Sequence, residues 1–470
     1  MPKILAGIEH IVVVMLENRS LDNMLGSLYT DGSGPALVLP RGGPSAFDGL
    51  RPGLTNPSNP GFFSGGGPDY VPVRDTVQAS TVPDPDPEET FVNVTFQLFG
   101  PEAPGTSPRW PMQGFRVNYA QAGASDPDQI LQCHGTAQLP ILAALARSYA
   151  VSDAWFASVP SQTWANRAFV HAGTSNGHVD NGEPPDPLEW DVRTIYPVLG
   201  QAKATWAVYH DTEIIPSLTR TMFPELWPDS LDGNFRGFAA FLADCANDSL
   251  PQYSFLEPSF LLDPNDDHPP HDVNAGEAFL RAIWDAVSGS AGFARTLLVI
   301  TFDEHGGCYD HVLPPFGAAP PDTASTPGDQ GFGFDRFGVR VPTVVVSPWI
   351  TAGTVFRSDA PAPYDHASIL ATLRDWLTIP ESLMLPSRRI AAAPTLGQLV
   401  TLSSPRTDIP SVPPAPTVVT ATPLTAEPNP LQRSLVSGTA RRYGIDPRAA
   451  LATVRTRQDA ADFLRRRGVK

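Results

Sequence analysis

The sequence predicts an α/β protein with a mostly parallel sheet that helices cover on both faces. Short, continuous runs of β-branched and other apolar residues recur along the chain, and such runs are typical of strands buried on both faces. Segments with the apolar spacing of amphipathic helices alternate with these runs. Strands that alternate with helices favour a parallel sheet between two helical layers.

The first elements are predicted in the N-terminal half of the chain. Residues 8–16 (IEHIVVVML) predict a central strand because the run is apolar almost throughout. Apolar residues at helical spacing predict a helix over 139–149, and the alternating segment 205–210 (TWAVYH) predicts another strand.

The remaining elements follow in the second half. Residues 275–287 have the pattern of an amphipathic helix. Residues 296–302 (TLLVITF) and 342–346 (PTVVV) predict two further buried strands. We expect a last helix after Asp365, which is a suitable N-cap residue.

The composition indicates a globular chain with stiff loops. Proline accounts for 52 and glycine for 38 of the 470 residues, roughly 19% together and below the roughly 25–30% typical of disordered chains. The net charge of −17 argues against nonspecific nucleic-acid binding. No apolar run approaches the roughly 18 residues of a membrane span. No leader is recognised, so we expect either a cytoplasmic protein or a secreted form whose leader has been removed.

Composition also divides the chain. Residues 1–402 form the predicted main domain, in which the loop-rich segment 26–90 is expected to be a cap or lid. Residues 403–430 are Pro-rich and predict a linker or wrap. Residues 431–470 carry ten Arg/Lys against three Asp, a charge of +7 that leaves −24 for the rest. This basic tail is predicted to be helical and either packs on its own chain or docks on a partner or an anionic lipid.

Pairs of polar residues follow two predicted strands. Glu17 and Asn18 follow the first strand, and Asp303 and Glu304 follow 296–302. If both strands are central and parallel, the two pairs meet at one rim of the sheet. Such an oxygen-rich set suits one hard divalent ion, Ca, Mg or Mn. The alternative is that these are ordinary solvated strand ends.

Two further polar clusters are candidates for a site. In SVPSQTWANR, a metal-bound hydroxyl of Ser158, Ser161 or Thr163 could act as a nucleophile and Arg167 could hold a phosphate, although a polar loop with an Asn cap is the simpler interpretation. In NDDHPPHD, His268 and His271 could contact phosphate and supply a general acid. A metal pair or a Pro-rich turn that caps the next helix are the alternatives. His311 and His366 are additional candidates.

These motifs together resemble the phosphoesterase family of nonspecific phospholipases C and related acid phosphatases, within the alkaline phosphatase and sulfatase-like superfold. The resemblance covers roughly residues 8–380. It rests on the stretches IEHIVVVMLENRSLDNMLG, QLPILAALARSYAVSDAWFASVPSQTWANRAFVHAGTS, NDDHPPHDV, VITFDEHGGCYDHVLPP, FDRFGVRVPTVVVSPWI and YDHASIL.

The resemblance implies a three-layer α/β sandwich with loop-rich insertions, in which residues 1–402 are the catalytic domain. It implies a metal-dependent phosphoesterase with Thr163 as nucleophile and His268 and His271 as catalytic histidines. The implied metal ligands are Glu17, Asn18, Thr163, Asp303 and Glu304. The implied phosphate-binding residues are Asn166, Arg167, His305 and His366.

The expected substrate is a phosphate ester, most of all a phospholipid cleaved in the manner of a phospholipase C. Phosphomonoester hydrolysis by an acid phosphatase is the alternative within the family, and a non-catalytic binding protein is the alternative of another class. Peripheral membrane contact through the basic tail is an alternative to packing of the tail on its own chain, and nucleic-acid binding is not expected. One departure stands out: where relatives often carry a histidine, this chain has Glu88 or Glu89.

Overall fold

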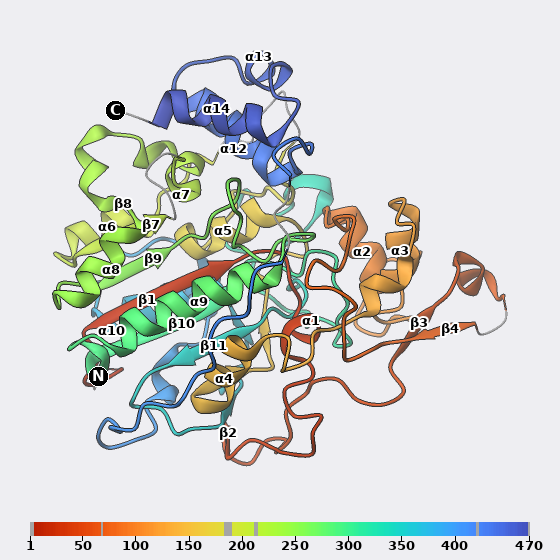
Figure 1. Ribbon diagram of the computed structural model, residues 1–470, viewed down its shortest axis with the longest axis horizontal. Coiled ribbons are helices and arrows are strands. Elements are labelled where there is room, and N and C mark those ends of the chain that lie inside the picture. Colours follow the sequence, from red (N-terminus) through yellow and green to blue (C-terminus); the bar gives the residue numbers. More distant parts are fainter. Residues whose placement is uncertain (1–3, 67–68, 183–189, 211–214, 420–422, 469–470) are drawn as a thin grey trace.

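The computed structural model describes residues 4–66, 69–182, 190–210, 215–419 and 423–468. Within these residues a nine-stranded sheet forms the centre, and helices cover both of its faces (Figure 1). The strands lie in the order β2 (Leu37–Leu39), β12 (Thr354–Phe356), β5 (Ala150–Ser152), β11 (Thr343–Val346), β10 (Thr296–Phe302), β1 (His10–Leu16), β9 (Tyr253–Leu256), β7 (Trp206–His210) and β8 (Phe235–Gly237). The predicted α/β class is confirmed.

Most neighbouring strands run parallel. The exception is β11, which is antiparallel to both β10 and β5. The central strands β1 and β10 are parallel neighbours, and all of β10 is buried, as is β1 from Ile11 onward. This is the burial that a continuous apolar run predicts.

The helices form two packed groups. One contains α4 (Pro140–Ser148), α8 (Phe238–Ala246) and α9 (Val273–Ser288), with α9 in front of β1 in Figure 1. The other contains α5 (Thr163–Ala172), α6 (Ile195–Gln201), α10 (Ala367–Trp376) and α11 (Arg388–Ala392). The predicted strands at 8–16, 205–210, 296–302 and 342–346 and the helices at 139–149 and 275–287 are confirmed as β1, β7, β10, β11, α4 and α9.

The cap of the last predicted helix is different from the expected one. Helix α10 begins after His366, and no side chain caps it. The Asp365 carboxylate instead accepts a hydrogen bond from Ser158 Oγ at 2.9 Å and one from Arg389 at 3.1 Å. A buried carboxylate that already has these partners ties three segments together rather than capping a helix.

The N-terminal insertion builds a small second core beside the sheet. Strands β3 (Thr55–Pro57) and β4 (Tyr70–Pro72) pair, and they lie with α2 (Phe91–Phe99) and α3 (Phe115–Gln121) at the right of Figure 1. Apolar residues of α2 and α3 pack on Tyr309, which follows β10 in the sequence. The insertion therefore reaches the end of β10, and its role as a cap or lid stays a prediction.

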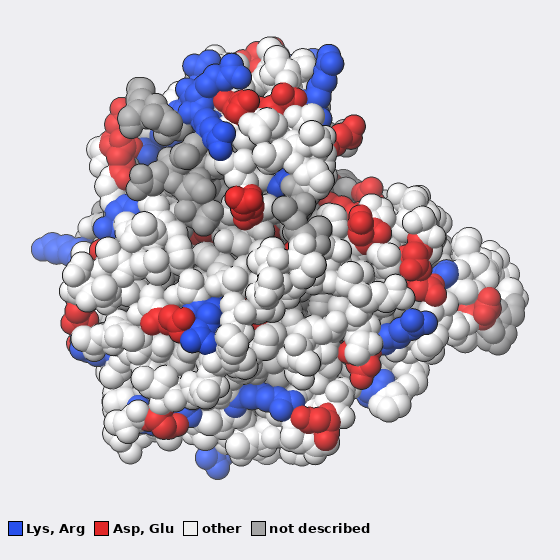
Figure 2. Space-filling model, viewed as in Figure 1, with Lys and Arg blue, Asp and Glu red and all other residues white. Residues whose placement is uncertain are grey.

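The C-terminal residues pack against their own chain. Helices α12 (Pro430–Arg442), α13 (Pro447–Ala452) and α14 (Arg457–Gly468) bury apolar residues, and α12 contacts α7 (Leu218–Met222). Gln432 Nε2 also donates to the Phe260 carbonyl at 2.8 Å. Arginines remain on the outer surface, where Figure 2 shows basic side chains on these helices. Membrane contact through this surface stays a prediction, and no described helix is both long and apolar enough to span a bilayer.

Replacement of Leu435 by Ala tests how firmly the C-terminal helices are held. Leu435 is fully buried in the main core, so the variant should lose about 2–5 kcal/mol through the cavity it creates. Chemical denaturation and hydrogen exchange of α12 measure the loss. Arg466→Ala, on the exposed surface of α14, is the control and should change stability by less than about 0.5 kcal/mol. Equal stability of the two variants would contradict this packing.

Candidate active site

The ends of β1 and β10 bring four of the predicted ligands together. Leu16 pairs with Phe302 in the parallel register, so the residues that follow each strand lie side by side. The Asn18 amide donates to Asp303 Oδ1 at 3.0 Å, and the Glu304 amide donates to the same oxygen at 2.7 Å. Glu17, Asn18, Asp303 and Glu304 are all buried, so the alternative of solvated strand ends is wrong.

Thr163 lies against this cluster as the first residue of α5. Its Oγ1 is 3.3 Å from Glu17 Oε2 and 3.4 Å from Asn18 Oδ1. The preceding residue, Gln162, is the N-cap, so the hydroxyl lies at the positive end of the helix dipole. The segment is therefore a helix start rather than only a polar loop.

Asn166 and Arg167 both point inward from α5. The Asn166 side chain bonds the backbone of Val159, Ser161 and Gln162, which fixes the turn before Thr163. This side chain therefore does not cap the helix. The Arg167 Nε donates to Glu17 Oε1 at 2.8 Å and lies 3.6 Å from Asp303 Oδ2. Its Nη1 is buried and has no hydrogen-bond partner among the described residues.

The two predicted catalytic histidines lie in the loop before α9. This loop is joined to the end of β1, because the Glu17 amide donates to the Asp266 carbonyl at 2.8 Å. The Asp266 carboxylate is 2.7 Å from His271 Nδ1 and accepts the His268 amide at 3.1 Å. Burial lowers the pKa of His268 to about 4, which keeps that ring neutral. The turn also caps α9 through Asp272.

His305 and His366 contact the cluster from outside. His366 Nε2 is 2.5 Å from the Asp303 carbonyl, and His305 Nδ1 is 3.2 Å from Glu304 Oε2. His305 Nε2 also bonds Gln97 of α2 at 2.8 Å. Burial lowers the pKa of His305 to about 3 and that of His366 to about 4. Both rings are therefore neutral and orient the segment that carries Asp303 and Glu304.

Too little positive charge surrounds the buried carboxyls of this cluster to keep all of them ionised. Burial raises the pKa of Glu17 and of Asp303, although Arg167 partly offsets this, and burial together with Glu89 and Asp303 raises that of Glu304 well above its usual range. Asp303 Oδ2 and Glu304 Oε1 have no hydrogen-bond partner among the described residues. Carboxylate, amide and hydroxyl oxygens with unmet bonding capacity are the donor set of a hard divalent cation. The residues present therefore fit such an ion.

A different group is the one among the described residues in which three acidic or histidine ligand atoms lie close enough together to hold a metal ion. Asp22, Asp310 and His311 each place a ligand atom within 4.8 Å of the others. Arg340, however, lies 3.2 Å from Asp22 Oδ1 and 3.0 Å from Asp310 Oδ1. Arg340 therefore supplies a positive charge to both of these carboxylates, whereas Glu304, after β10, has no ion pair with an arginine or lysine among the described residues.

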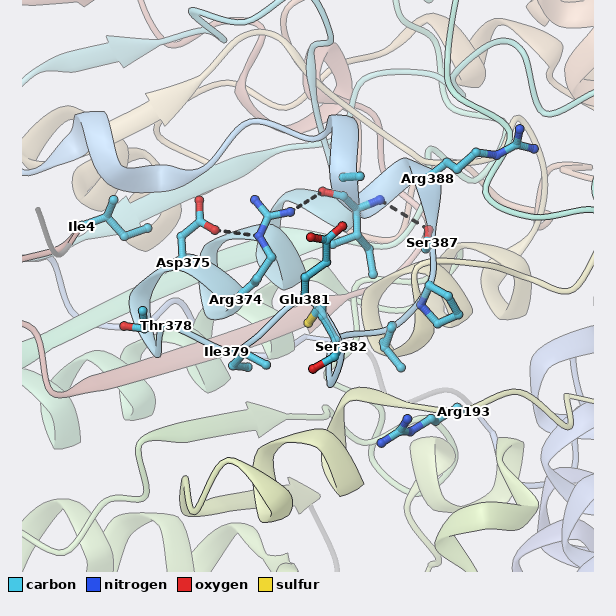
Figure 3. Close-up of a pocket in the computed structure, with 15 residues that line it drawn as sticks. Ile4, Arg193, Arg374, Asp375, Thr378, Ile379, Glu381, Ser382, Ser387 and Arg388 are labelled. Carbon is cyan, nitrogen blue, oxygen red and sulfur yellow. Dashed lines mark hydrogen bonds and ion pairs between the residues drawn. The ribbon is translucent and has the colours of Figure 1, made fainter. Parts of the chain in front are cut away.

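A surface pocket lies apart from both groups. It has a volume of about 1130 Å³ and opens between the end of α10 and α11 (Figure 3). Its lining includes Arg374, which pairs with Asp375, and apolar residues such as Met384. None of the predicted site residues is among the described residues that line it.

Some residues at the site carried no distinct signal in the sequence. Asp266 and Gln97 orient site histidines, and Gln162 precedes the nucleophile candidate and contacts Glu89. Asp266 was recognisable only as an acid beside histidines, Gln97 lies far from the other site residues in the chain, and Glu89 stood out only as one of two adjacent acids where relatives often carry a histidine. Only the folded chain brings them together.

Comparisons with known proteins give consistent results. The sequence matches the model of the phosphoesterase family over residues 8–380. Non-specific phospholipase C3 of Arabidopsis thaliana is 33% identical over 422 residues, covering 86% of this chain and 75% of that protein. Phospholipase C B of Mycobacterium tuberculosis is 28% identical over 424 residues, covering 81% and 75%. Among solved structures, the lipoteichoic acid synthase LtaP from Listeria monocytogenes aligns with a TM-score of 0.33 and 14% identity, covering 55% of this chain and 70% of that one.

The Asp22–His311 pair makes stability depend on pH. Burial alone lowers the pKa of His311, but hydrogen bonds to Asp22 and Asp48 outweigh it and raise the pKa to about 9. The contribution of protonated His311 to the free energy of unfolding is fully present below about pH 6.5, the pKa of histidine in the unfolded chain. It is lost as the pH rises through about 9, the pKa in the folded protein. The advantage of the native protein over His311→Gln in unfolding free energy, measured with chelator present, should therefore shrink from pH 6 to pH 10. A constant difference would contradict the assignment.

Proposed function

The chain belongs to the phosphoesterase family, and from this premise we propose that it is a phospholipase C that uses a threonine nucleophile beside a divalent cation. As a member of that family it is a hydrolase of phosphoester bonds. The observation that carries the finer proposal is the position of Thr163 Oγ1 between Glu17 and Asn18 at the start of α5. The phospholipase C names of the relatives support the choice of a phospholipid substrate.

Thr163 Oγ1 attacks phosphorus and forms a phosphothreonine diester, while the bond from phosphorus to the diacylglycerol oxygen breaks. A divalent cation held by Glu17, Asn18, Thr163, Asp303 and Glu304 would acidify the hydroxyl and offset charge on the phosphoryl oxygens, typically worth several kcal/mol. The N-terminus of α5 favours the anionic oxygen for the same electrostatic reason. Water then attacks phosphorus and gives a proton to His271, which had protonated the diacylglycerol oxygen, while the bond from phosphorus to Thr163 Oγ1 breaks and this oxygen takes back from solvent the proton that it released in the first step.

We assign the proton donor to His271 and phosphate contact to His268. The Asp266 carboxylate lies 2.7 Å from His271 Nδ1 and orients the ring, which leaves Nε2 as the atom that can transfer a proton to the leaving group. His268 has its Nδ1 on the Pro269 carbonyl at 2.7 Å and is neutral. The single N–H of the neutral ring is on Nδ1 and donates to this carbonyl, so His268 contacts a phosphoryl oxygen through Nε2 when an anionic phosphate draws a second proton onto that nitrogen.

The remaining predicted residues support this centre. Arg167 has a buried Nη1 free to donate to a phosphoryl oxygen while its Nε holds Glu17. Asn166 fixes the turn that presents Thr163. His305 and His366 contact the Asp303–Glu304 segment and act as positioning residues.

Thr163→Ala should reduce kcat by at least about 1,000-fold, because no other group supplies the attacking oxygen. The fold should be retained, since the side chain only loses a hydroxyl and a methyl group. Ser161→Ala, which removes a hydroxyl in the same turn that bonds Asp180 instead, is the matched control and should keep most activity. Turnover of Thr163→Ala near the wild-type rate would overturn the nucleophile assignment.

Substrate class and metal dependence can be measured with one set of assays. Phosphatidylcholine, a phosphomonoester and a sulfate ester are each incubated with the protein, with and without chelator. We expect release of diacylglycerol from the phospholipid, loss of activity with chelator and recovery on adding Ca, Mg or Mn. Hydrolysis of the monoester alone would favour the acid phosphatase alternative. No turnover under any condition would favour a binding protein.

A further inference from the structure

Asn181 has a buried side chain that the mechanism above does not use. It follows Trp164 by 17 residues in the chain, and its exposed fraction is only 6%. Its Oδ1 accepts the Trp164 amide at 2.8 Å, and its own amide donates to Gln162 Oε1 at 3.0 Å. Asn181 therefore bonds the residues on both sides of Thr163.

The bond to the Trp164 amide caps α5 from outside the helix. Gln162 is the N-cap residue, and its own side chain makes no capping hydrogen bond. A cap normally accepts from the second or third amide of a helix, because the first amides have no acceptor within it. Trp164 is the second residue of α5, so the distant Asn181 takes this role. With Gln162 Oε1 on the Asn181 amide, the two residues form a reciprocal pair comparable with a capping box.

Two different asparagines hold the two peptide groups that flank Thr163. Asn166 Nδ2 donates to the Gln162 carbonyl at 3.2 Å, in the peptide group before Thr163. Asn181 Oδ1 accepts the Trp164 amide, in the peptide group after it. Because each peptide group is planar, holding both of them fixes the direction of the Cα–Cβ bond between them. The position that the Thr163 hydroxyl can reach therefore depends on both asparagines.

The segment that carries Asn181 is itself anchored through its neighbour Asp180. Asp180 Oδ1 accepts the Phe91 amide at 2.8 Å and Ser161 Oγ at 2.7 Å. Its Oδ2 accepts Gln330 Nε2 at 2.5 Å. Phe91 is the first residue of α2, so this anchor joins Asn181 to the N-terminal insertion. Because three bonds hold Asp180, the loss of one of them in Ser161→Ala leaves the segment attached.

We propose that Asn181 is a positioning residue that sets the geometry from which the Thr163 hydroxyl attacks phosphorus. This inference rests on the proposed function, in which Thr163 is the nucleophile. The bonds of Asn181 go to Gln162 and to the Trp164 amide, so it acts through the start of α5. A displacement of a reacting atom by about 1 Å can lower a rate about 100-fold. Loss of Asn181 should therefore lower kcat rather than weaken substrate binding.

The first test measures the backbone and needs no substrate. Hydrogen exchange of residues 161–167 is compared among the full-length wild type, Asn181→Ala and Asn181→Asp. Ala removes the acceptor of the Trp164 amide, so exchange in this segment should become about fivefold faster, the equivalent of a lost helix cap. Asp keeps an acceptor oxygen, which is favoured at a helix N-terminus, and should restore the protection. Unchanged exchange in Asn181→Ala would overturn the proposal whatever the activity of that variant.

The second test measures catalysis with 4-nitrophenyl phosphorylcholine, a soluble phosphodiester. Asn181→Ala should lower kcat at least about tenfold and change KM less than about twofold, and Asn181→Asp should regain most of the lost rate. Ser217→Ala removes the side-chain cap of α7 instead, so this matched control should lose similar thermal stability and keep kcat.

A fall in kcat that Ser217→Ala shares would overturn the proposal, because loss of any helix cap would then suffice. Thr163→Ala distinguishes the failure of this inference from that of the proposed function. If Thr163→Ala is inactive and Asn181→Ala has wild-type kcat, this inference fails and the proposed function stands. If Thr163→Ala turns over substrate, the proposed function fails, and the role of Asn181 in catalysis fails with it.

Discussion

The parallel pairing of β1 with β10 is the constraint on which the rest of the site depends. Both strands are apolar and buried, so neither can shift without exposing hydrophobic surface, and their register is fixed from His10–Thr296 to Leu16–Phe302. Both strands end at the same level. The polar residues that follow them are therefore forced into one buried position, where Glu17, Asp303 and Glu304 could not remain charged on their own.

The molecule meets the cost of buried carboxylates in two ways. Arg340 lies between Asp22 and Asp310, and hydrogen bonds fill the rest of that network, so it is a structural ion-pair cluster. At the ends of β1 and β10 one arginine, Arg167, contacts both Glu17 and Asp303, and Asp303 Oδ2 and Glu304 Oε1 have no hydrogen-bond partner among the described residues. An ion-pair network that served only to stabilise the fold would gain no stability from having too few basic side chains around its carboxylates. The shortage of positive charge is what a site that binds a cation and an anionic phosphoester requires.

Elements with long apolar runs could be predicted from the sequence, whereas strands of three residues and single capping residues could not. The strands β1 and β10 were predicted because each is a run of seven largely apolar residues. Strands such as β5 and β12 have three residues each, and their neighbours in the sheet, rather than their own sequence, make them strands. The predicted cap Asp365 has the right residue type, but its bonds to Ser158 and Arg389 come from segments remote in sequence. The segment around Thr163 left a polar loop and a site open, and the structure shows that Thr163 begins a helix in which Asn166 and Arg167 are buried.

The sequence by itself determined the α/β class, the central strands and the residue types at their ends, because hydrophobic periodicity and strand termini are local properties of the chain. The motif resemblance identified Thr163 and the two histidines as candidates before any coordinates. Tertiary structure alone decided that Asp266 orients His271 and that Glu89, not Glu88, is buried and accepts a hydrogen bond from Gln162. The physical reason is that burial and net charge at a point are sums over segments that are distant in sequence, and only the packed fold specifies which segments contribute.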